Sequence, residues 1–242
     1  MDRRALIDGA AALDVALTPL DAERFERYAV ELLDWNRRIN LTAITDPIEI
    51  VRKHFLDSLA LLACCGFQSG DSIIDVGSGA GLPGLPIALA RPDVQVTLLE
   101  ATRKKCDFLR HIVARLGVGN VSIVNARAED AARDPAHRER HAVAVARAVA
   151  EMATLAEYLL PFVRIGGWIV AQKSGEIEAE VGRAEQAILA LGGHVRRVAP
   201  LRLPGIEAAR YAVIVDKVAA TPDKYPRRAG MPEKRPIGSR RG

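Results

Sequence analysis

The stretch Asp75-Val-Gly77-Ser-Gly79-Ala-Gly81-Leu-Pro-Gly84 decides the fold expected for this 242-residue chain. It follows the apolar run Ser72–Val76 and opens a segment of helical character. Closely spaced glycines let the backbone turn sharply and leave room for a ligand against exposed N–H groups at a helix start. Alone, the pattern also fits the G-x-G-x-x-G fingerprint of dinucleotide-binding proteins, or a plain tight turn.

Short apolar runs alternate with helical segments after this loop, which is typical of βαβ units in a parallel sheet. Only residues 204–210 separate the last two runs, too few for a crossover helix, so these strands should be antiparallel. The sequence therefore predicts an α/β, Rossmann-like fold with a seven-stranded, mostly parallel sheet and a C-terminal antiparallel hairpin. The predicted strands are Ser72–Val76, Val94–Leu99, Val121–Val124, Ala142–Ala146, Gly167–Lys173, His194–Leu203 and Tyr211–Val218.

Helical segments precede the sheet. Thr18 and Pro19 form one helix start, and Asp46 can cap a second helix whose apolar stripe ends near Gly66. A chain of this length suits one large domain with appendages. We expect residues 1–66 to form a helical region packed on the sheet, residues 67–220 the cofactor-binding core, and residues 221–242 a C-terminal arm.

Composition and charge exclude several classes of protein. Hydrophobic residues make up 49% and charged residues 26% of the chain, as in ordinary globular proteins. The apolar runs are too short for membrane spans and no secretory signal is recognisable, which predicts a cytoplasmic protein. Cys64, Cys65 and Cys106 lack the spacing of a disulfide framework or a zinc site, so no metal is expected.

The segment Thr221–Gly242 carries seven Lys or Arg against two acids. Its prolines disfavour a helix or a central strand, so we expect an extended, basic arm. Such a charge asymmetry suits a polyanionic partner or a merely solvated surface.

Two acids at strand ends indicate the ligand. Asp75 can face the positive amino and sulfonium end of S-adenosylmethionine, directly or through water, and Glu100 can accept hydrogen bonds from the two ribose hydroxyls. NAD would use an acid such as Glu100 equally well. Asp75 and the C-terminal hairpin therefore favour S-adenosylmethionine, because a dinucleotide dehydrogenase would keep its crossovers and add a substrate domain.

Further candidate residues follow the third and fourth predicted strands. Ala128 and Glu129 stand where an adenine would rest, although acids also suit a helix start without a ligand. Arg147 ends the fourth strand, where open α/β sheets bind ligands, and can pair with a cofactor carboxylate or an RNA phosphate. His54 and Asp57 lie one helical turn apart. They form either a catalytic pair or, as we favour, a fastening between the helical region and the sheet.

Six motifs together resemble the RsmG family, also called glucose-inhibited division protein B. Their order and spacing cover nearly the whole chain. The motifs are Asn40-Leu-Thr-Ala-Ile44, His54-Phe-Leu-Asp57-Ser58-Leu59, Asp75-Val-Gly-Ser-Gly-Ala-Gly-Leu-Pro-Gly84, Arg127-Ala-Glu129, Arg147-Ala-Val-Ala150 and Tyr225-Pro-Arg-Arg-Ala-Gly-Met-Pro232.

The resemblance implies a class I methyltransferase that transfers a methyl group from S-adenosyl-L-methionine to N7 of a guanine in bacterial 16S ribosomal RNA or the small-subunit particle. The sequence leaves the oligomeric state open, and we expect a monomer. N7 already presents a lone pair, so we expect no catalytic base, and catalysis would come mainly from orientation. The resemblance implies cofactor contacts at Gly77, Leu82, Ala128, Glu129 and Arg147, to which the loop and strand-end arguments add Gly79 and Glu100. Leu82 stands where many members have Phe.

RNA contacts are expected from cations at the cofactor mouth and on the arm, because such contacts to phosphates position RNA. The candidates are Arg147, Lys173, Arg210, Arg227, Arg228, Lys234 and Arg235. Two other functions compete with this one. An NAD-dependent oxidoreductase would need a hydride-transfer residue, and none stands out; a noncatalytic RNA-binding module would tolerate a broken glycine loop, yet Gly77, Gly79 and Gly81 are present.

Overall fold

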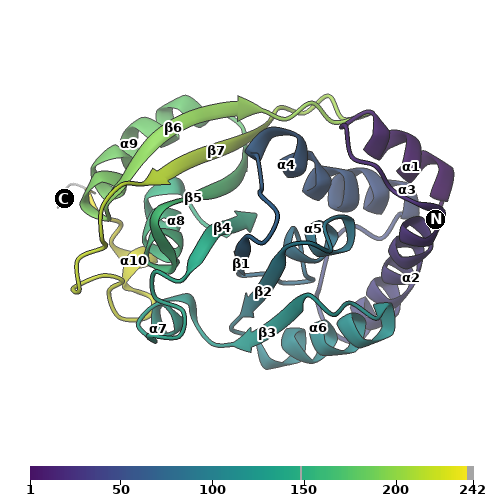
Figure 1. Cartoon of the computed structure of the whole chain (residues 1–242), viewed down its shortest axis with the longest axis horizontal. Coiled ribbons are helices and arrows are strands. Elements are labelled where there is room, and N and C mark those ends of the chain that lie inside the picture. The colour runs from purple at the N-terminus through teal and green to yellow at the C-terminus, as the bar shows by residue number, and fades with distance from the viewer. Residues whose placement is uncertain (148, 239–242) are drawn as a thin grey trace.

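One seven-stranded sheet runs through the middle of the computed structural model, which describes residues 1–147 and 149–238 (Figure 1). The strand order is β3-β2-β1-β4-β5-β7-β6. The strands are β1 Ser72–Val76, β2 Gln95–Glu100, β3 Val121–Asn125, β4 His141–Arg147, β5 Val163–Ser174, β6 Gly193–Pro200 and β7 Arg210–Lys217.

Strands β1 to β5 are mutually parallel, whereas β7 is antiparallel to both of its neighbours, β5 and β6. The α/β fold and the antiparallel C-terminal hairpin predicted from sequence are thus confirmed. No pattern in the sequence predicts that β7 inserts between β5 and β6. This insertion makes the start of β7 lie at the same edge as the carboxyl end of β5, where Ser174 pairs with Arg210.

Strand β5 begins earlier than predicted, at Val163 rather than Gly167. Its pairing with β4 shifts register between Val163 and Trp168, so the glycines there form an irregularity within the strand. A Cβ at Gly167 would lie 2.3 Å from the carbonyl oxygen of Ala142, so only glycine fits this approach. The glycine therefore looked like a strand boundary but marks a bulge.

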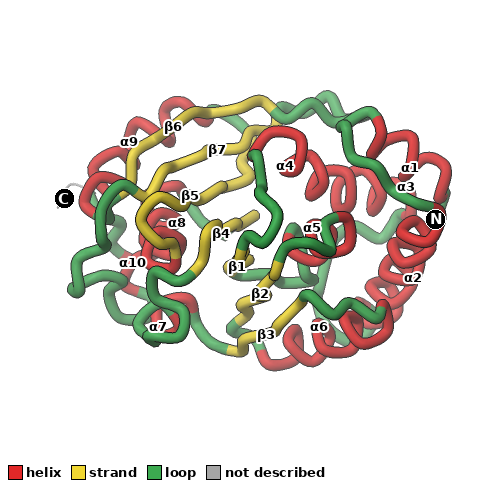
Figure 2. Tube along the Cα trace, viewed as in Figure 1, coloured by secondary structure: helices red, strands yellow, loops and turns green. Residues whose placement is uncertain are grey.

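Helices cover both faces of the sheet, as Figure 2 shows. Because successive strand residues face opposite sides, Ile73 packs in one core cluster and Ile74 in the other. The helices are α1 Arg3–Ala11, α2 Pro19–Asn36, α3 Pro47–Ile50, α4 Asp57–Cys65, α5 Gly84–Ala90, α6 Arg103–Leu116, α7 Ala128–Ala131, α8 Met152–Leu159, α9 Ile177–Ala190 and α10 Met231–Lys234. A π-helical stretch, Val51–Leu56, joins α3 to α4, and a 3-10 turn, Leu160–Phe162, follows α8.

The N-terminal helices begin where their caps predict. Thr18 and Asp21 form a reciprocal capping box at α2, and Asp46 accepts hydrogen bonds from the backbone N–H groups of Ile48 and Glu49 at α3. No helix in the described part of the chain is long and apolar enough to cross a membrane.

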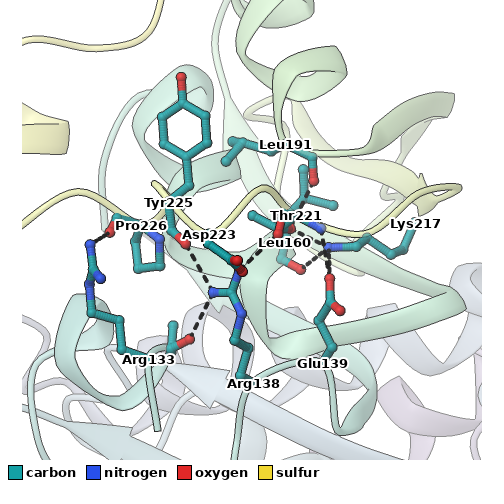
Figure 3. A network of polar contacts seen from close by, with 11 residues as sticks. Arg133, Arg138, Glu139, Leu160, Leu191, Lys217, Thr221, Asp223, Tyr225 and Pro226 are labelled. Atoms are coloured by element: carbon teal, nitrogen blue, oxygen red, sulfur yellow. Dashed lines mark hydrogen bonds and ion pairs between the residues drawn. The ribbon is translucent and has the colours of Figure 1, made fainter. Parts of the chain in front are cut away.

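The C-terminal segment 221–238 lies along the protein and is not extended throughout, because Met231–Lys234 form α10. Arg138 donates hydrogen bonds to the carbonyl oxygens of Tyr225 and Thr221, at 2.9 and 2.8 Å (Figure 3). Arg133 binds the carbonyl oxygen of Pro226 at 2.6 Å. The expectation of a wholly extended arm was therefore wrong. Arginines from the loop before β4 hold its backbone carbonyls on the protein.

A buried lysine anchors the start of this segment. Lys217 is 1% exposed, and its Nζ lies 3.0 Å from Glu139 and contacts the hydroxyl of Thr221 (Figure 3). Burial lowers the pKa of Lys217, and the Glu139 carboxylate opposes that shift. The charge is thus paired and hydrogen-bonded inside the protein, which a buried ammonium requires.

Candidate cofactor and RNA site

The glycine loop connects the carboxyl end of β1 to α5. Gly77, Gly79 and Gly81 all have positive φ, at 75°, 57° and 93°, a region in which other residues are strained. The N–H groups of Gly77 and Ser78 both donate to the carbonyl oxygen of Leu99 in β2, at 2.9 and 3.1 Å. The loop is thereby fixed at the carboxyl edge of the sheet.

Asp75 braces this loop from inside the protein. The residue is fully buried, and its Oδ2 accepts a hydrogen bond from the N–H of Gly84 at 2.9 Å. A Cβ at Gly84 would lie 2.8 Å from that oxygen and 2.6 Å from Leu98, so the position requires glycine. Burial raises the pKa of Asp75 to about 7. Sequence reasoning missed this bracing role; the predicted approach of Asp75 to a positive ligand group rests on Oδ1, which has no hydrogen-bond partner.

Glu100 lies where β2 ends and faces the glycine loop. Its two carboxylate oxygens accept hydrogen bonds from the N–H groups of Gly79 and Thr102, at 3.0 and 2.7 Å, and the residue is 7% exposed. A carboxylate offers about four acceptor positions. Glu100 therefore keeps acceptor capacity for a ribose while it holds Gly79, so the structure brings together Gly77, Gly79 and Glu100.

Ala128 and Glu129 begin α7, directly after β3. Glu129 is 4% exposed, and its Oε1 accepts a hydrogen bond from the backbone N–H of Gly230 at 2.7 Å. The C-terminal segment thus touches a residue predicted to bind the cofactor. No local sequence signal indicates this contact, because the two residues are 101 positions apart.

Leu82 contributes to the loop through its backbone, whose N–H donates to the carbonyl oxygen of Ser78 at 3.0 Å. Its side chain is 6% exposed and packs in the core cluster that contains the N-terminal helices. The side chain therefore packs in the protein core, and its contact with the cofactor stays a prediction.

Arg147 ends β4, as predicted, but it has partners within the protein. Its Nη1 donates to Asp57 Oδ2 at 2.9 Å and to the carbonyl oxygen of Lys53 at 3.0 Å. The side chains of Arg147 and Asp57 are 15% and 7% exposed. The pair therefore fastens the N-terminal helices to the sheet, a role that the sequence did not indicate. The contact of Arg147 with a cofactor or RNA stays a prediction.

His54 does not pair with Asp57. Its Nε2 lies 2.8 Å from the hydroxyl of Thr42, and its Nδ1 lies 3.1 Å from the carbonyl oxygen of Lys53. Burial, reinforced by Arg147, lowers the pKa of His54 to about 4. The π-helical stretch keeps the two side chains apart, because its wider turn moves residues three positions apart off a shared face. Asp57 takes the favoured fastening role through Arg147 instead.

A cavity of about 350 Å³ opens beside Arg147 at the carboxyl edge of β4 and β5. Four cations line it together with the single carboxylate of Asp57, so it favours an anionic or electron-rich partner. Its lining residues are Ile44, Lys53, His54, Asp57, Arg147, Gln172, Lys173, Ser174 and Arg210.

Several cations predicted to bind RNA are instead held by acids. Lys173 pairs with Glu180 at 2.6 Å, and Arg227 pairs with the fully buried Glu157 at 2.6 Å. Arg210 lies 3.9 Å from Asp57. Arg228, Lys234 and Arg235 are exposed, and their RNA contacts stay predictions.

Other cations at the same edge have no ion pair or side-chain hydrogen bond within residues 1–147 and 149–238. They lie in the first turn of α6, just after Glu100, and at the residue that caps α7. These cations are Arg103, Lys104, Lys105 and Arg127. Sequence reasoning missed them because it weighed only the arm and the strand ends near Arg147.

The residues present fit S-adenosylmethionine. The glycine loop provides a backbone cradle in which a Cβ at Gly77 would lie 3.0 Å from the side chain of Val149. Glu100 offers acceptors for ribose hydroxyls, and the buried Asp75 Oδ1 offers one for a cationic group. In the described part of the chain, no three His, Cys, Asp or Glu side chains are grouped to hold a metal ion.

Comparison with solved structures shows the fold. A SAM-dependent methyltransferase from Aquifex aeolicus superposes with a TM-score of 0.54 at 15% identity, covering 77% of this chain and 98% of that structure. The [4+2]-cyclase SpnF superposes with a TM-score of 0.57 at 11% identity, covering 85% of this chain and 99% of that structure. Because a cyclase shares the fold, the fold alone does not determine the reaction.

Sequence relatives are far more similar. The ribosomal RNA small subunit methyltransferase G of Dehalococcoides mccartyi is 47% identical, covering 96% of this chain and 98% of that protein. The protein of the same name from Roseiflexus castenholzii is 52% identical, covering 94% and 97%. The model of the family described as rRNA small subunit methyltransferase G matches residues 21–204. The chain therefore belongs to the rRNA small subunit methyltransferase G family.

Proposed function

We propose that this protein transfers a methyl group from S-adenosyl-L-methionine to N7 of a guanine in 16S ribosomal RNA. The observation that supports this most is the adjacency, at one sheet edge, of the glycine loop with Glu100 and the cationic cavity beside Arg147. A methyl donor bound by the glycine loop and Glu100 would lie next to a base bound in the cavity. Open α/β sheets bind ligands at this edge, where the strand order reverses.

The chain's own residues bind and orient. S-adenosylmethionine supplies an electrophilic methyl group on a positively charged sulfur. Glu100 and the backbone of Gly79 hold the ribose end, and Ala128 with Glu129 border the adenine. Asp75 keeps the loop in shape through Gly84. Two reactants held in line gain most of their rate from orientation.

No side chain of the site needs to act as a base. Guanine N7 carries a lone pair and no proton, so it forms the new bond to carbon without losing a hydrogen. The ring becomes positively charged as the bond forms, and the Asp57 carboxylate in the cavity stabilises that charge. His54, with its pKa at about 4, stays neutral and structural.

RNA phosphates would be held mainly by the cations without internal partners. Arg103 and Lys104 are exposed at the start of α6, and Arg127 is exposed where α7 begins. They flank the glycine loop on the side opposite the cavity, since β2 and β3 lie on one side of β1 and β4 and β5 on the other. RNA bound across this edge would pass both the methyl donor and the cavity.

We also propose that the protein works as a monomer in the cytoplasm. All the residues assigned above to cofactor, base and phosphate come from one chain, so no second copy is needed to complete the site. Sedimentation at the concentration of the methylation assay tests the monomer.

Methyl transfer itself tests the proposed function. Protein and methyl-labelled S-adenosylmethionine are incubated with small-subunit rRNA from a strain lacking the gene and, in parallel, with small subunits from that strain. We expect label in 7-methylguanosine after digestion to nucleosides. Cofactor binding without label in either substrate would contradict the assignment of the substrate.

A further inference from the structure

Two oxygens among the residues that line the cavity are buried and have no hydrogen-bond partner within residues 1–147 and 149–238: Asp57 Oδ1 and Gln172 Oε1. Each residue is 5% exposed. An unpaired buried acceptor is costly, so such a group in a native fold calls for an explanation. Two of them beside one cavity indicate a ligand that brings hydrogen-bond donors.

The contacts of Asp57 and Gln172 hold each side chain in place and leave one oxygen of each free to accept a hydrogen bond. Asp57 Oδ2 receives Arg147 at 2.9 Å, which leaves Oδ1 with only the Arg210 Nε at 3.9 Å, beyond hydrogen-bonding distance. Gln172 Nε2 donates to the carbonyl oxygen of Asp57 at 2.6 Å. Because a carbonyl oxygen can only accept, this contact fixes the amide orientation and makes Oε1 the free atom.

The ligand that satisfies two acceptors must present two donors on one edge. Guanine does so with N1–H and the N2 amino group, on the side of the ring opposite N7. Adenine presents one donor group next to the N1 acceptor, cytosine one amino group next to N3, and uracil one N–H between two carbonyls. The two acceptors belong to residues that contact each other. Among the four bases, guanine alone brings two donor groups on one edge and still leaves N7 unengaged.

We propose that Asp57 and Gln172 select the target guanine by binding its Watson–Crick edge, an inference that rests on the proposed function. N1–H, the more acidic donor, pairs with the charged Asp57 Oδ1, and the N2 amino group pairs with Gln172 Oε1. Enzymes that modify a base commonly read it this way once it has left the stack.

Inosine at the target position tests the proposal, because it differs from guanosine only by the missing N2 amino group. The guanine labelled by the wild-type protein is first mapped, and ligated rRNA is then prepared with guanosine or inosine there. We expect kcat/KM to be about 10- to 100-fold lower for inosine, since Gln172 Oε1 is left unpaired.

Gln172→Met should abolish this discrimination. The variant keeps the side-chain volume but has no acceptor, so the guanosine-to-inosine ratio should fall to within about 3-fold of one, mainly through slower reaction of guanosine. The matched control is Gln95→Met, at the exposed amino end of β2, which should keep the wild-type ratio. Cofactor affinity, measured with S-adenosylhomocysteine by calorimetry, should be unchanged in both variants.

Equal rates of the wild-type protein on guanosine and inosine would overturn the inference while the proposed function stood. An unchanged ratio in Gln172→Met with intact cofactor affinity would do the same. The wild-type comparison needs no variant, so it decides even if Gln172→Met fails to fold. Absence of any transfer to guanosine RNA would instead overturn the proposed function, and this inference with it.

Discussion

Glu100 carries the cofactor assignment at the scale of single residues. Glu100→Ala should weaken binding of S-adenosylhomocysteine about 10- to 100-fold, because hydrogen bonds to a charged group are lost and Gly79 is released from its 3.0 Å contact. Calorimetric titration measures this. Glu178→Ala, an exposed acid in α9, is the matched control and should bind like the wild-type protein. Equal affinity in the two variants would contradict the assignment.

The ionisation of Asp75 makes the stability of the protein depend on pH, and the direction of that dependence follows from the raised pKa. The pKa of Asp75 is about 7 in the folded protein against an ordinary value of 3.8, so the folded state binds the proton more tightly than the unfolded chain does. This residue's contribution to stability is therefore present at low pH and declines as pH rises from about 4 through about 7.

Asp75→Asn removes this titration while keeping an oxygen for the N–H of Gly84. The wild-type free energy of unfolding should fall relative to that of the variant between pH 5 and 7, with a slope of at most about 1.4 kcal/mol per pH unit. Urea unfolding of both proteins over this range measures it. A difference that does not vary with pH would show that Asp75 is ionised throughout.

Site residues that follow consecutive strands could be predicted from the sequence. Pairs of residues that lie far apart in the sequence and meet only in the fold could not. The loop glycines and Glu100 follow consecutive strands, so the sheet places them together. Arg147 and Asp57 are 90 positions apart, and Glu129 and Gly230 are 101 apart. No local spacing specifies such pairs, so the sequence could not show that Asp57 is the partner of Arg147.

Among the helices and strands, the first turn of α6 gives the most direct test of RNA binding. Arg103→Ala should lower rRNA affinity and reduce the slope of log affinity against log salt by about one, as expected for one lost phosphate contact. Arg164→Ala is the control, because Arg164 is exposed at the amino end of β5, at the opposite edge. Filter binding across a salt series measures both. Equal slopes would rule out an RNA contact at Arg103.

Element prediction succeeded where the pattern is local and failed where packing decides. The caps at Thr18 and Asp46 and the short C-terminal connection were sufficient for α2, α3 and the hairpin. The π-helical stretch Val51–Leu56 could not be foreseen, because its sequence has an ordinary helical stripe. The bulge at Gly167 depends on the approach of Ala142 from another strand.

For the whole molecule, the C-terminal segment is part of the fold and reaches the cofactor site. Arg227 binds Glu157 through its side chain and its backbone N–H, and three residues later Gly230 binds Glu129. Arg227→Ala removes the ion pair of the buried Glu157 and leaves it only the backbone N–H of residue 227, which should cost about 3 kcal/mol in the free energy of unfolding.

The same variant should also weaken cofactor binding about 2- to 10-fold, because Glu129 loses its partner when the segment loosens. Arg228→Ala, at the neighbouring exposed residue, should change neither stability nor cofactor affinity. Thermal unfolding and calorimetric titration of the two variants compare them directly. If Arg227→Ala binds the cofactor as tightly as the wild-type protein does, the C-terminal segment does not support cofactor binding.

In the proposed reaction N7 of a guanine accepts the methyl group. Replacing that one nitrogen atom in the RNA tests this directly. Small-subunit rRNA transcribed with 7-deazaguanosine keeps the Watson–Crick edge that Asp57 and Gln172 would bind but has carbon in place of N7. We predict that this RNA competes with the ordinary transcript for binding to the protein but receives no labelled methyl group, while the ordinary transcript is labelled. Equal labelling of the two transcripts would contradict it.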